Sequence, residues 1–214
     1  MILSKIHCFP DDKFNKRVAN FLKKKISDSK NIVITAGKTV KPIYKILDKY
    51  NFKKKNIYLS DERIVPYSSN LSNYKNLKNY NFIKKNKFIH FNIENRFSKI
   101  RSKEYFKSIS KIKILDFSIL SLGKNCHVAS IFFKKNTKSN QVYFFYKYRR
   151  ISISLKILAR SKEIIIICNK KQRAAELAKN IKNKKKGFKF FNNQKTIFLF
   201  GKTSCTNFFR NIGV

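Results

Sequence analysis

The chain has 214 residues, 43% of them hydrophobic, and its 50 Lys and Arg against 11 Asp and Glu give a formal net charge of +39. This length and apolar content predict one domain over residues 1–214 and exclude a disordered chain. No apolar run approaches the roughly 20 residues of a membrane helix, and Lys5 interrupts the opening apolar residues too early for a secretory signal, so we expect a cytoplasmic protein without a membrane partner.

The positive charge has two interpretations. A nucleic-acid partner would require many basic residues, usually gathered on one face or stripe. The lysines are instead spread along the whole chain, and Lys, Asn, Ile, Phe and Tyr, whose codons are rich in A and T, are abundant, whereas there are only 5 Gly, 3 Pro and no Trp. The composition therefore favours the codon bias of an AT-rich genome, with no specific nucleic-acid partner.

The four cysteines, at positions 8, 126, 168 and 205, are scattered and have no Cys-x-x-Cys spacing. Without a secretion signal we expect no disulfide framework, and three of the four should pack as small apolar residues. Cys126 is different because it precedes His127. A nucleophilic Cys-His pair is the alternative there, although neighbours in the sequence rarely make the side-chain contact that activation needs.

Helices and strands are predicted to alternate along the first third of the chain. Asp11 and Asp12 precede a helix with an acidic first turn. Its apolar residues recur at helical spacing, at Phe14, Val18, Phe21, Leu22 and Ile26. A short apolar strand follows at residues 31–35, and Gly37 turns the chain into a helix with Pro42 in its first turn.

The same alternation continues to the end of the chain. Further strands are expected at residues 57–60, 88–91, 117–122, 151–155, 163–168 and 196–200. Further helices are expected at residues 72–80, 98–109, 173–181 and near Thr206. This order predicts a three-layer α/β fold, modified Rossmann-like, with a mainly parallel sheet covered by helices on both faces. Ligands bind such sheets at the carboxyl ends of the strands, where the polar motifs of this chain fall.

The first polar motif is Thr35-Ala36-Gly37-Lys38-Thr39, between a strand and a helix. Backbone N–H groups at Gly37 and Thr39, with the charge of Lys38, would suit a phosphate group. The Walker phosphate loop is not matched, so a nucleoside triphosphate is not implied. An ordinary strand-to-helix turn is the alternative.

The second motif, Asp61-Glu62-Arg63, places two adjacent carboxylates in a chain poor in acids. In extended backbone they cannot both point the same way, so we expect one to face the cleft and the other to brace the turn. Arg63 suits a phosphate or an oxyanion, and Arg150, entering a later strand, could reach an anionic ligand. The alternatives are a solvated strand end with a local ion pair and, for Arg150, an ordinary surface position.

The third motif is His127, which follows the strand at residues 117–122 and a turn at Gly123. Histidine is the side chain whose ordinary pKa best suits a general base near neutral pH. A structural histidine is the alternative, but the turn, the strand end and the nearby Ser130 favour chemistry.

Together these motifs resemble the 6-phosphogluconolactonase family, within the larger group that includes glucosamine-6-phosphate isomerases and deaminases. The matching segments, in order, are Thr35 to Tyr44, Asp61-Glu62-Arg63-Ile64-Val65-Pro66, Ser72-Asn73-Tyr74, Asp116 to Phe132 and Arg150-Ile151-Ser152. The resemblance runs from about Asn31 to Ala178. With Ser72-Asn73-Tyr74 counted as part of the Asp61 motif, these are four motifs in the family's order, and together they are more specific than any one of them.

The resemblance implies hydrolysis of 6-phosphoglucono-1,5-lactone to 6-phosphogluconate in the oxidative pentose phosphate pathway, without a metal or an organic cofactor. It implies that His127 activates water, that Arg63 stabilises the oxyanion, and that Asp61 orients the His or binds sugar hydroxyls. Phosphate would be held by Gly37, Lys38, Thr39 and Arg150. Asn125 and Glu62 would support these residues without contacting the substrate. We expect the protein to be a monomer or a weak homo-oligomer.

The chain departs from the family pattern at several positions. Asn125 replaces an Asp and Cys126 a Gly immediately before the His, while Ala36 and Val40 replace a Gly and a Pro in the first loop. An Asn loses the charge that could stabilise an imidazolium, and a Cys strains a turn that needs φ > 0. An isomerase or deaminase of amino-sugar phosphates and a degenerate, non-catalytic sugar-phosphate binder are the alternatives. The residues after Ser130 lack the Glu that the deaminase branch uses, which favours the lactonase branch.

Overall fold

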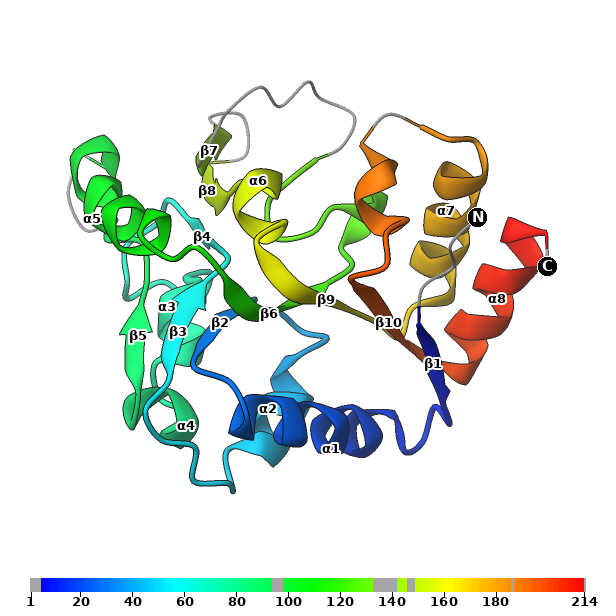
Figure 1. The fold of residues 1–214 in the computed structure, drawn as a ribbon, viewed down its shortest axis with the longest axis horizontal. Helices are drawn as coiled ribbons and strands as arrows, with labels where there is room; N and C mark the ends of the chain where they lie inside the picture. The colour runs from blue at the N-terminus through cyan, green and yellow to red at the C-terminus, as the bar shows by residue number, and fades with distance from the viewer. Residues whose placement is uncertain (1–4, 94–97, 133–141, 146–148, 186, 214) are drawn as a thin grey trace.

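The computed structural model describes residues 5–93, 98–132, 142–145, 149–185 and 187–213. Its centre is a seven-stranded sheet in the order β1-β10-β9-β6-β2-β3-β5, in which all neighbouring strands are parallel. The strands are β1 (Ile6–Phe9), β2 (Asn31–Ile34), β3 (Asn56–Leu59), β5 (Lys87–Ile89), β6 (Leu115–Ser121), β9 (Ser161–Cys168) and β10 (Thr196–Gly201). Helices α1 and α2 lie on one side of this sheet, with α7 and α8 on the other (Figure 1). The predicted three-layer, Rossmann-like α/β fold is confirmed.

The long helices lie where the apolar spacing predicts them. They are α1 (Phe14–Ser27), α2 (Lys41–Leu47), α5 (Ser98–Ser110), α7 (Lys171–Lys182) and α8 (Lys202–Ile212). None of the described helices is both long enough and apolar enough to span a bilayer. The signal-peptide prediction concerns residues 1–4, which lie outside the described residues.

The helix predicted at residues 72–80 is present but shorter: α3 spans Asn73–Leu77. A second short helix, α4 (Asn81–Lys84), follows it, and the two are separate because Tyr80 between them is extended at φ −67° and ψ 135°. Ser72 caps α3 by accepting a hydrogen bond from the Lys75 N–H at 3.1 Å, which fixes the start of this helix beside β4.

A smaller antiparallel sheet, in the order β4-β8-β7, stands beside the main one. Its strands are β4 (Asp61–Arg63), β7 (Val142–Phe145) and β8 (Arg150–Ile153). The strand expected at residues 151–155 is thus β8, and it lies outside the parallel sheet; the short helix α6 (Leu155–Leu158) follows it. In the β4–β8 register Asp61 lies opposite Ser152 and Arg63 opposite Arg150, so this sheet brings two of the predicted site motifs together.

The order of the main sheet defines where a ligand can bind. From β2 the chain proceeds outward through β3 and β5, and from β6 it proceeds the other way through β9 and β10. The direction reverses between β2 and β6, which are direct neighbours. At such a switch point the loops after the two strands diverge and leave a crevice. Those loops are the Gly37 segment and the Gly123–His127 segment.

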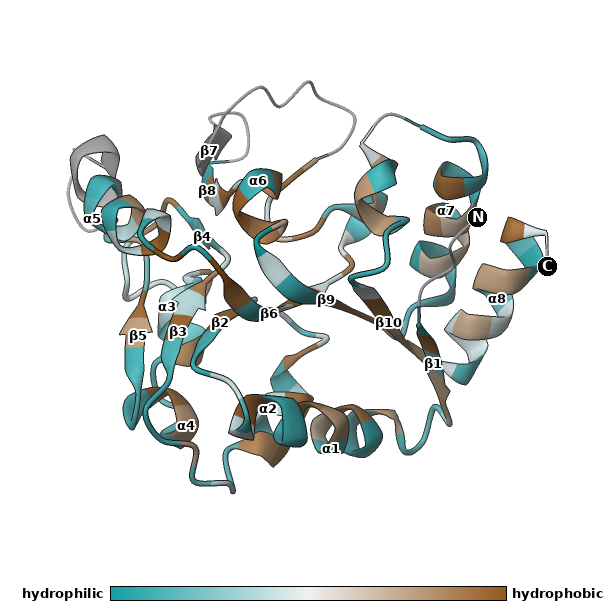
Figure 2. Cartoon of the chain, in the orientation of Figure 1, coloured by the Kyte–Doolittle hydropathy of each residue, from teal (hydrophilic) through white to brown (hydrophobic). Residues whose placement is uncertain are grey.

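The core that supports this crevice is built from the central strands. In β9, residues 164–167 are each at most 1% exposed, because helices cover both faces of the sheet. Figure 2 shows the hydrophobic residues concentrated along β9 and β10, with polar residues on the outer parts of the helices. The strand predicted at residues 163–168 is therefore confirmed, and most of it is buried.

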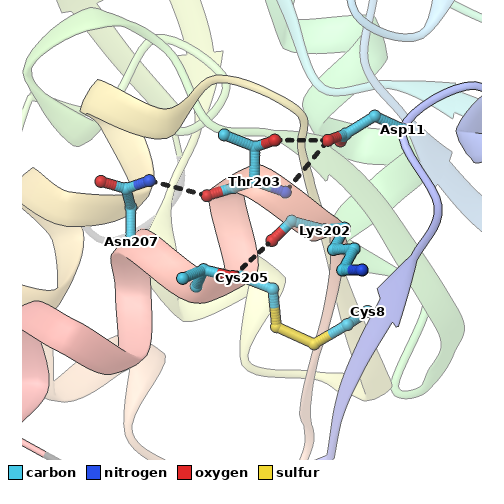
Figure 3. The surroundings of a disulfide bond; sticks show 7 residues. Cys8, Asp11, Lys202, Thr203, Cys205 and Asn207 are labelled. Atoms are coloured by element: carbon cyan, nitrogen blue, oxygen red, sulfur yellow. Dashed lines mark hydrogen bonds between the residues drawn. A yellow bond between two sulfur atoms is a disulfide. The ribbon is translucent and has the colours of Figure 1, made fainter.

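The expectation that no disulfide forms is wrong for one pair. Cys8 of β1 and Cys205 of α8 are joined, with their Cα atoms 5.8 Å apart (Figure 3). They are 197 positions apart in the sequence, so only the pairing of β1 with β10, the strand that leads into α8, brings them together. Cys168 is a buried free thiol, as expected, and Cys126 is also buried and free.

Asp11 also has a different role from the one predicted. Helix α1 begins at Phe14 and has no acidic residue in its first turn. The Asp11 carboxylate instead accepts a hydrogen bond from the backbone N–H of Thr203, at 3.1 Å, and so caps α8 (Figure 3). An anion at a helix N-terminus is stabilising wherever in the chain it originates, which is why sequence proximity to α1 was misleading.

Candidate active site

A pocket of about 510 Å³ opens at the switch point, where β2 and β6 end. Residues from the Gly37 loop, β4, the His127 turn, β8 and the start of α7 line it. Of the residues singled out in the sequence, the lining includes Gly37, Lys38, Thr39, Asp61, Arg63, His127 and Arg150. Glu62 and Asn125 are not part of the lining. Four separate motifs therefore converge on one cavity.

The pocket is strongly basic. The cationic residues in its lining are Lys38, Arg63, Lys124, Arg150, Lys170 and Arg173, whereas Asp61 is the one acid among the described lining residues. This imbalance suits an anionic ligand. Sequence reasoning did not assign Lys124, Lys170 or Arg173 to the site. The available signal was their place directly after β6 and β9, at the carboxyl edge of the sheet.

Two hydrogen bonds from residues of α2 hold the Gly37 loop in place. Gly37 has φ +138°, a conformation that L side chains rarely adopt, and a Cβ there would meet nothing within 4 Å, so the backbone rather than crowding requires glycine. The fully buried Tyr44 hydroxyl donates to the Thr35 carbonyl at 3.0 Å, and the Lys41 N–H donates to the Gly37 carbonyl at 3.1 Å. These bonds fix the loop that carries Lys38 and Thr39 into the pocket.

Asp61 and Glu62 point in different directions, as expected, and Asp61 is the carboxylate that lines the pocket. One Asp61 oxygen accepts from the Ser60 hydroxyl at 2.9 Å, and the other accepts from the Ser130 hydroxyl at 2.6 Å. The second oxygen also lies 3.6 Å from Nη1 of Arg150, which donates to Ser130 at 3.3 Å. Asp61 therefore holds the Arg150 guanidinium at the wall of the pocket.

Glu62 braces the turn behind the pocket. Its side chain is 1% exposed and accepts from the backbone N–H groups of Arg63, Asn73 and Tyr74 at 2.6–2.7 Å, and from the Ser72 hydroxyl at 3.2 Å. Burial raises the pKa of Glu62, while these N–H groups oppose the rise. The carboxylate ties β4 to the start of α3.

Arg63 lies between this brace and the pocket. Its Nη1 donates to the Leu71 carbonyl at 2.5 Å and to Oδ1 of Asn73 at 2.9 Å. Both of these hydrogen bonds use the same nitrogen. The guanidinium thus retains further N–H groups, in fixed planar geometry, for an anion in the pocket.

His127 is held by the backbone of its own turn. Its Nδ1 lies 2.6 Å from the Lys124 carbonyl oxygen, and its carbonyl accepts from the Gly123 N–H at 2.8 Å. A carbonyl can only accept, so Nδ1 carries the proton and Nε2 of the neutral ring keeps its lone pair. Burial lowers the pKa of His127, opposed by the Lys124 carbonyl and by Asp61. A neutral imidazole with a free Nε2 is the form that a general base requires.

The turn before His127 has left-handed backbone at both positions that depart from the family pattern. Asn125 has φ +59° and Cys126 has φ +57°. The strain expected for Cys126 in place of a Gly is therefore present, whereas Asn tolerates this region well. Cys126 is fully buried outside the pocket lining, and burial raises its pKa to about 12. A thiol in that state is no nucleophile, so the alternative Cys-His pair is wrong.

Asn125→Asp is expected to change kcat/KM by less than about fivefold, because an exposed charge contributes under ~1 kcal/mol. Asn125 is exposed, and Nδ1 of His127 is already held by Lys124. The measurement is steady-state kinetics of the variant beside the unaltered protein. A gain of tenfold or more would mean that the missing carboxylate does act on His127.

Metal ions in proteins are held mainly by acidic, His and Cys side chains. In the part of the chain that the structure describes, no three of these residues are grouped so that they could hold a metal ion. The groups that do converge in the pocket are one imidazole, one carboxylate and several cations. This set can bind an anion and move a proton.

Fold and site together define a Rossmann-like α/β protein with an anion-binding pocket and a histidine at the switch point. A family model described as glucosamine-6-phosphate isomerases/6-phosphogluconolactonase matches residues 11–190. The chain belongs to this family.

Individual relatives agree with this assignment. A 6-phosphogluconolactonase from Thermotoga maritima is 26% identical over 207 residues, which cover 91% of this chain and 93% of the relative. A crystal structure of 6-phosphogluconolactonase from the same organism has a TM-score of 0.80 at 24% identity, covering 93% of this chain and 100% of that one. A monomeric glucosamine-6-phosphate deaminase has a TM-score of 0.75 at 14% identity, covering 95% and 99%. The fold is thus common to both activities.

Proposed function

We propose that this chain hydrolyses 6-phosphoglucono-1,5-lactone to 6-phosphogluconate. The observation that carries the proposal is the position of His127, its Nδ1 2.6 Å from the Lys124 carbonyl oxygen, in a basic pocket shared with Arg63. The family and the relative from Thermotoga maritima support this substrate.

In the proposed reaction, Nε2 of His127 takes a proton from water as the water oxygen bonds to the lactone carbonyl carbon. The carbonyl oxygen becomes an oxyanion, which the Arg63 guanidinium stabilises. The ring C–O bond then breaks, and the proton on the imidazole passes to the departing ring oxygen. No atom or electron beyond water and substrate is needed.

The phosphate of the substrate is proposed to bind the basic residues of the pocket. Lys38, with the Gly37 and Thr39 backbone, and Arg150, positioned by Asp61, are the predicted ligands. Lys170 and Arg173, which also line the pocket, would add positive charge near the phosphate. Binding energy at this remote group would orient the lactone carbonyl toward His127. Asp61 acts here through Arg150, since His127 is oriented by a backbone carbonyl instead.

The alternative deaminase activity is less well supported. Ring opening and deamination of an amino-sugar phosphate need several proton transfers, and the one described carboxylate in the pocket, Asp61, is engaged by Ser60 and Ser130. The test is a pH-stat assay with the lactone, beside an ammonia-release assay with glucosamine 6-phosphate. We expect acid release well above the spontaneous rate and no ammonia; the reverse result would refute the lactonase proposal.

We further propose that the protein works in the cytoplasm, as a monomer or weak homo-oligomer, without a specific nucleic-acid partner. The even spread of its lysines supports the last point. Sequence-dependent DNA or RNA binding that persists at about 150 mM salt would contradict it.

A further inference from the structure

Asn73 is a buried polar residue whose role the proposed reaction does not explain. It is the first residue of α3 and is 3% exposed. Its amide nitrogen Nδ2 donates to the Asp61 carbonyl at 2.8 Å, and its Oδ1 accepts from Nη1 of Arg63 at 2.9 Å. Its backbone N–H donates to Glu62 at 2.6 Å. The Asn73 side chain therefore links the backbone of β4, at Asp61, to the guanidinium of Arg63 in the same strand.

The amide group is required by this arrangement. The Asp61 carbonyl needs a donor, whereas Nη1 of Arg63 needs an acceptor, and an amide carries the two functions on separate atoms that reach both partners. A carboxylate of the same size could accept from Arg63 but would not donate to the carbonyl when ionised. An Ala or Ser would leave buried groups unsatisfied.

Asn73 also bears on how far Arg63 can move. The Arg63 side chain has several rotatable bonds, and apart from Asn73 its described hydrogen bond is to the Leu71 carbonyl, in an exposed loop segment. Leu71 itself is 58% exposed. The buried amide is thus the firmer of the two restraints on the guanidinium. Stabilisation of an oxyanion depends on donors that are oriented before the charge develops.

We propose that Asn73 is the positioning residue of Arg63: it fixes the guanidinium where the oxyanion forms, and it acts on the reaction only through Arg63. This inference rests on the proposed lactonase function. Asn73 also lines the pocket, but both polar atoms of its side chain are engaged, by the Asp61 carbonyl and by Arg63, so it is assigned no contact with the substrate. Its neighbour Ser72 caps α3 and contacts Glu62 instead of Arg63.

The test is a set of variants assayed for kcat, KM and thermal stability. Asn73→Ala is expected to lower kcat roughly tenfold with little change in KM, a fraction of the 10²–10³-fold loss expected when an oxyanion donor is removed. Ser72→Ala is the matched control: it removes a buried side-chain hydrogen bond to Glu62 at the neighbouring position and should lower stability while leaving kcat unchanged. In an Arg63→Ala background, Asn73→Ala should cause no further loss of kcat.

The outcomes separate this proposal from the proposed function. Loss of kcat that is additive in the double variant, or equal in Asn73→Ala and Ser72→Ala, would overturn the positioning role. If the unaltered protein does not hydrolyse the lactone, the function fails, and ¹⁵N NMR of the arginine side chains still tests Asn73. Restricted Arg63 guanidinium signals that become mobile in Asn73→Ala, but not in Ser72→Ala, support the proposal; unchanged signals overturn it.

Discussion

His127→Ala is expected to lower kcat by about 10²–10⁴-fold, the usual contribution of a general base, with a much smaller change in KM. The reason is that phosphate binding is assigned to the cations of the pocket, which the substitution leaves in place. The measurement is initial-rate kinetics over a range of lactone concentrations, corrected for spontaneous hydrolysis. Turnover equal to that of the unaltered protein would remove His127 from the mechanism.

The pH profile gives an independent check on His127. The protonated imidazolium cannot accept a proton from water, so kcat/KM should fall as the pH drops through the pKa of the free protein. Burial lowers that pKa, so the acid limb should lie below the ordinary histidine value of about 6.5. Cys126→Ser is the control, since its buried thiol has a pKa of about 12 and should contribute no limb near neutrality.

The parts of the fold that could be predicted are those with strong local signals. The apolar run of β9 and the helical spacing in α1 each determine one element without help from the rest of the chain. Strand β1 was missed, because His7 interrupts its apolar residues and none of its four residues is fully buried, as expected of an edge strand paired only with β10. The Cys8–Cys205 disulfide depends on that same pairing and was missed with it.

In the site, residue types were predictable but contacts were not. The adjacency of Asp61 and Glu62 shows that they must diverge, and the structure confirms it. That the Nδ1 partner of His127 is the Lys124 carbonyl, however, depends on the left-handed turn between them. Arg173 lines the pocket because α7 starts at its edge. Both are consequences of tertiary geometry, which local spacing does not encode.

Gly123→Ala is expected to lower kcat by about 10²-fold, the cost of misplacing a catalytic group by roughly 1 Å. The backbone itself tolerates alanine, since Gly123 has φ −86°. A Cβ at this position, however, would overlap Cε1 and Nε2 of the His127 ring. The ring is also packed against Phe132, with centroids 4.6 Å apart, so we expect it to make room by giving up its bond to Lys124.

The cost to stability should be about 1–3 kcal/mol, because a side chain rather than the core gives way. Gly201→Ala is the matched control: its Cβ would overlap the Asp11 carboxylate at the start of α8, far along the chain from His127. That variant should lose comparable stability and keep its kcat. The measurements are kcat and thermal unfolding of both variants. A Gly123→Ala protein with normal kcat would show that catalysis does not require the imidazole to lie against this turn. The hydrogen bond between Nδ1 of His127 and the Lys124 carbonyl would then have no role in orienting the ring.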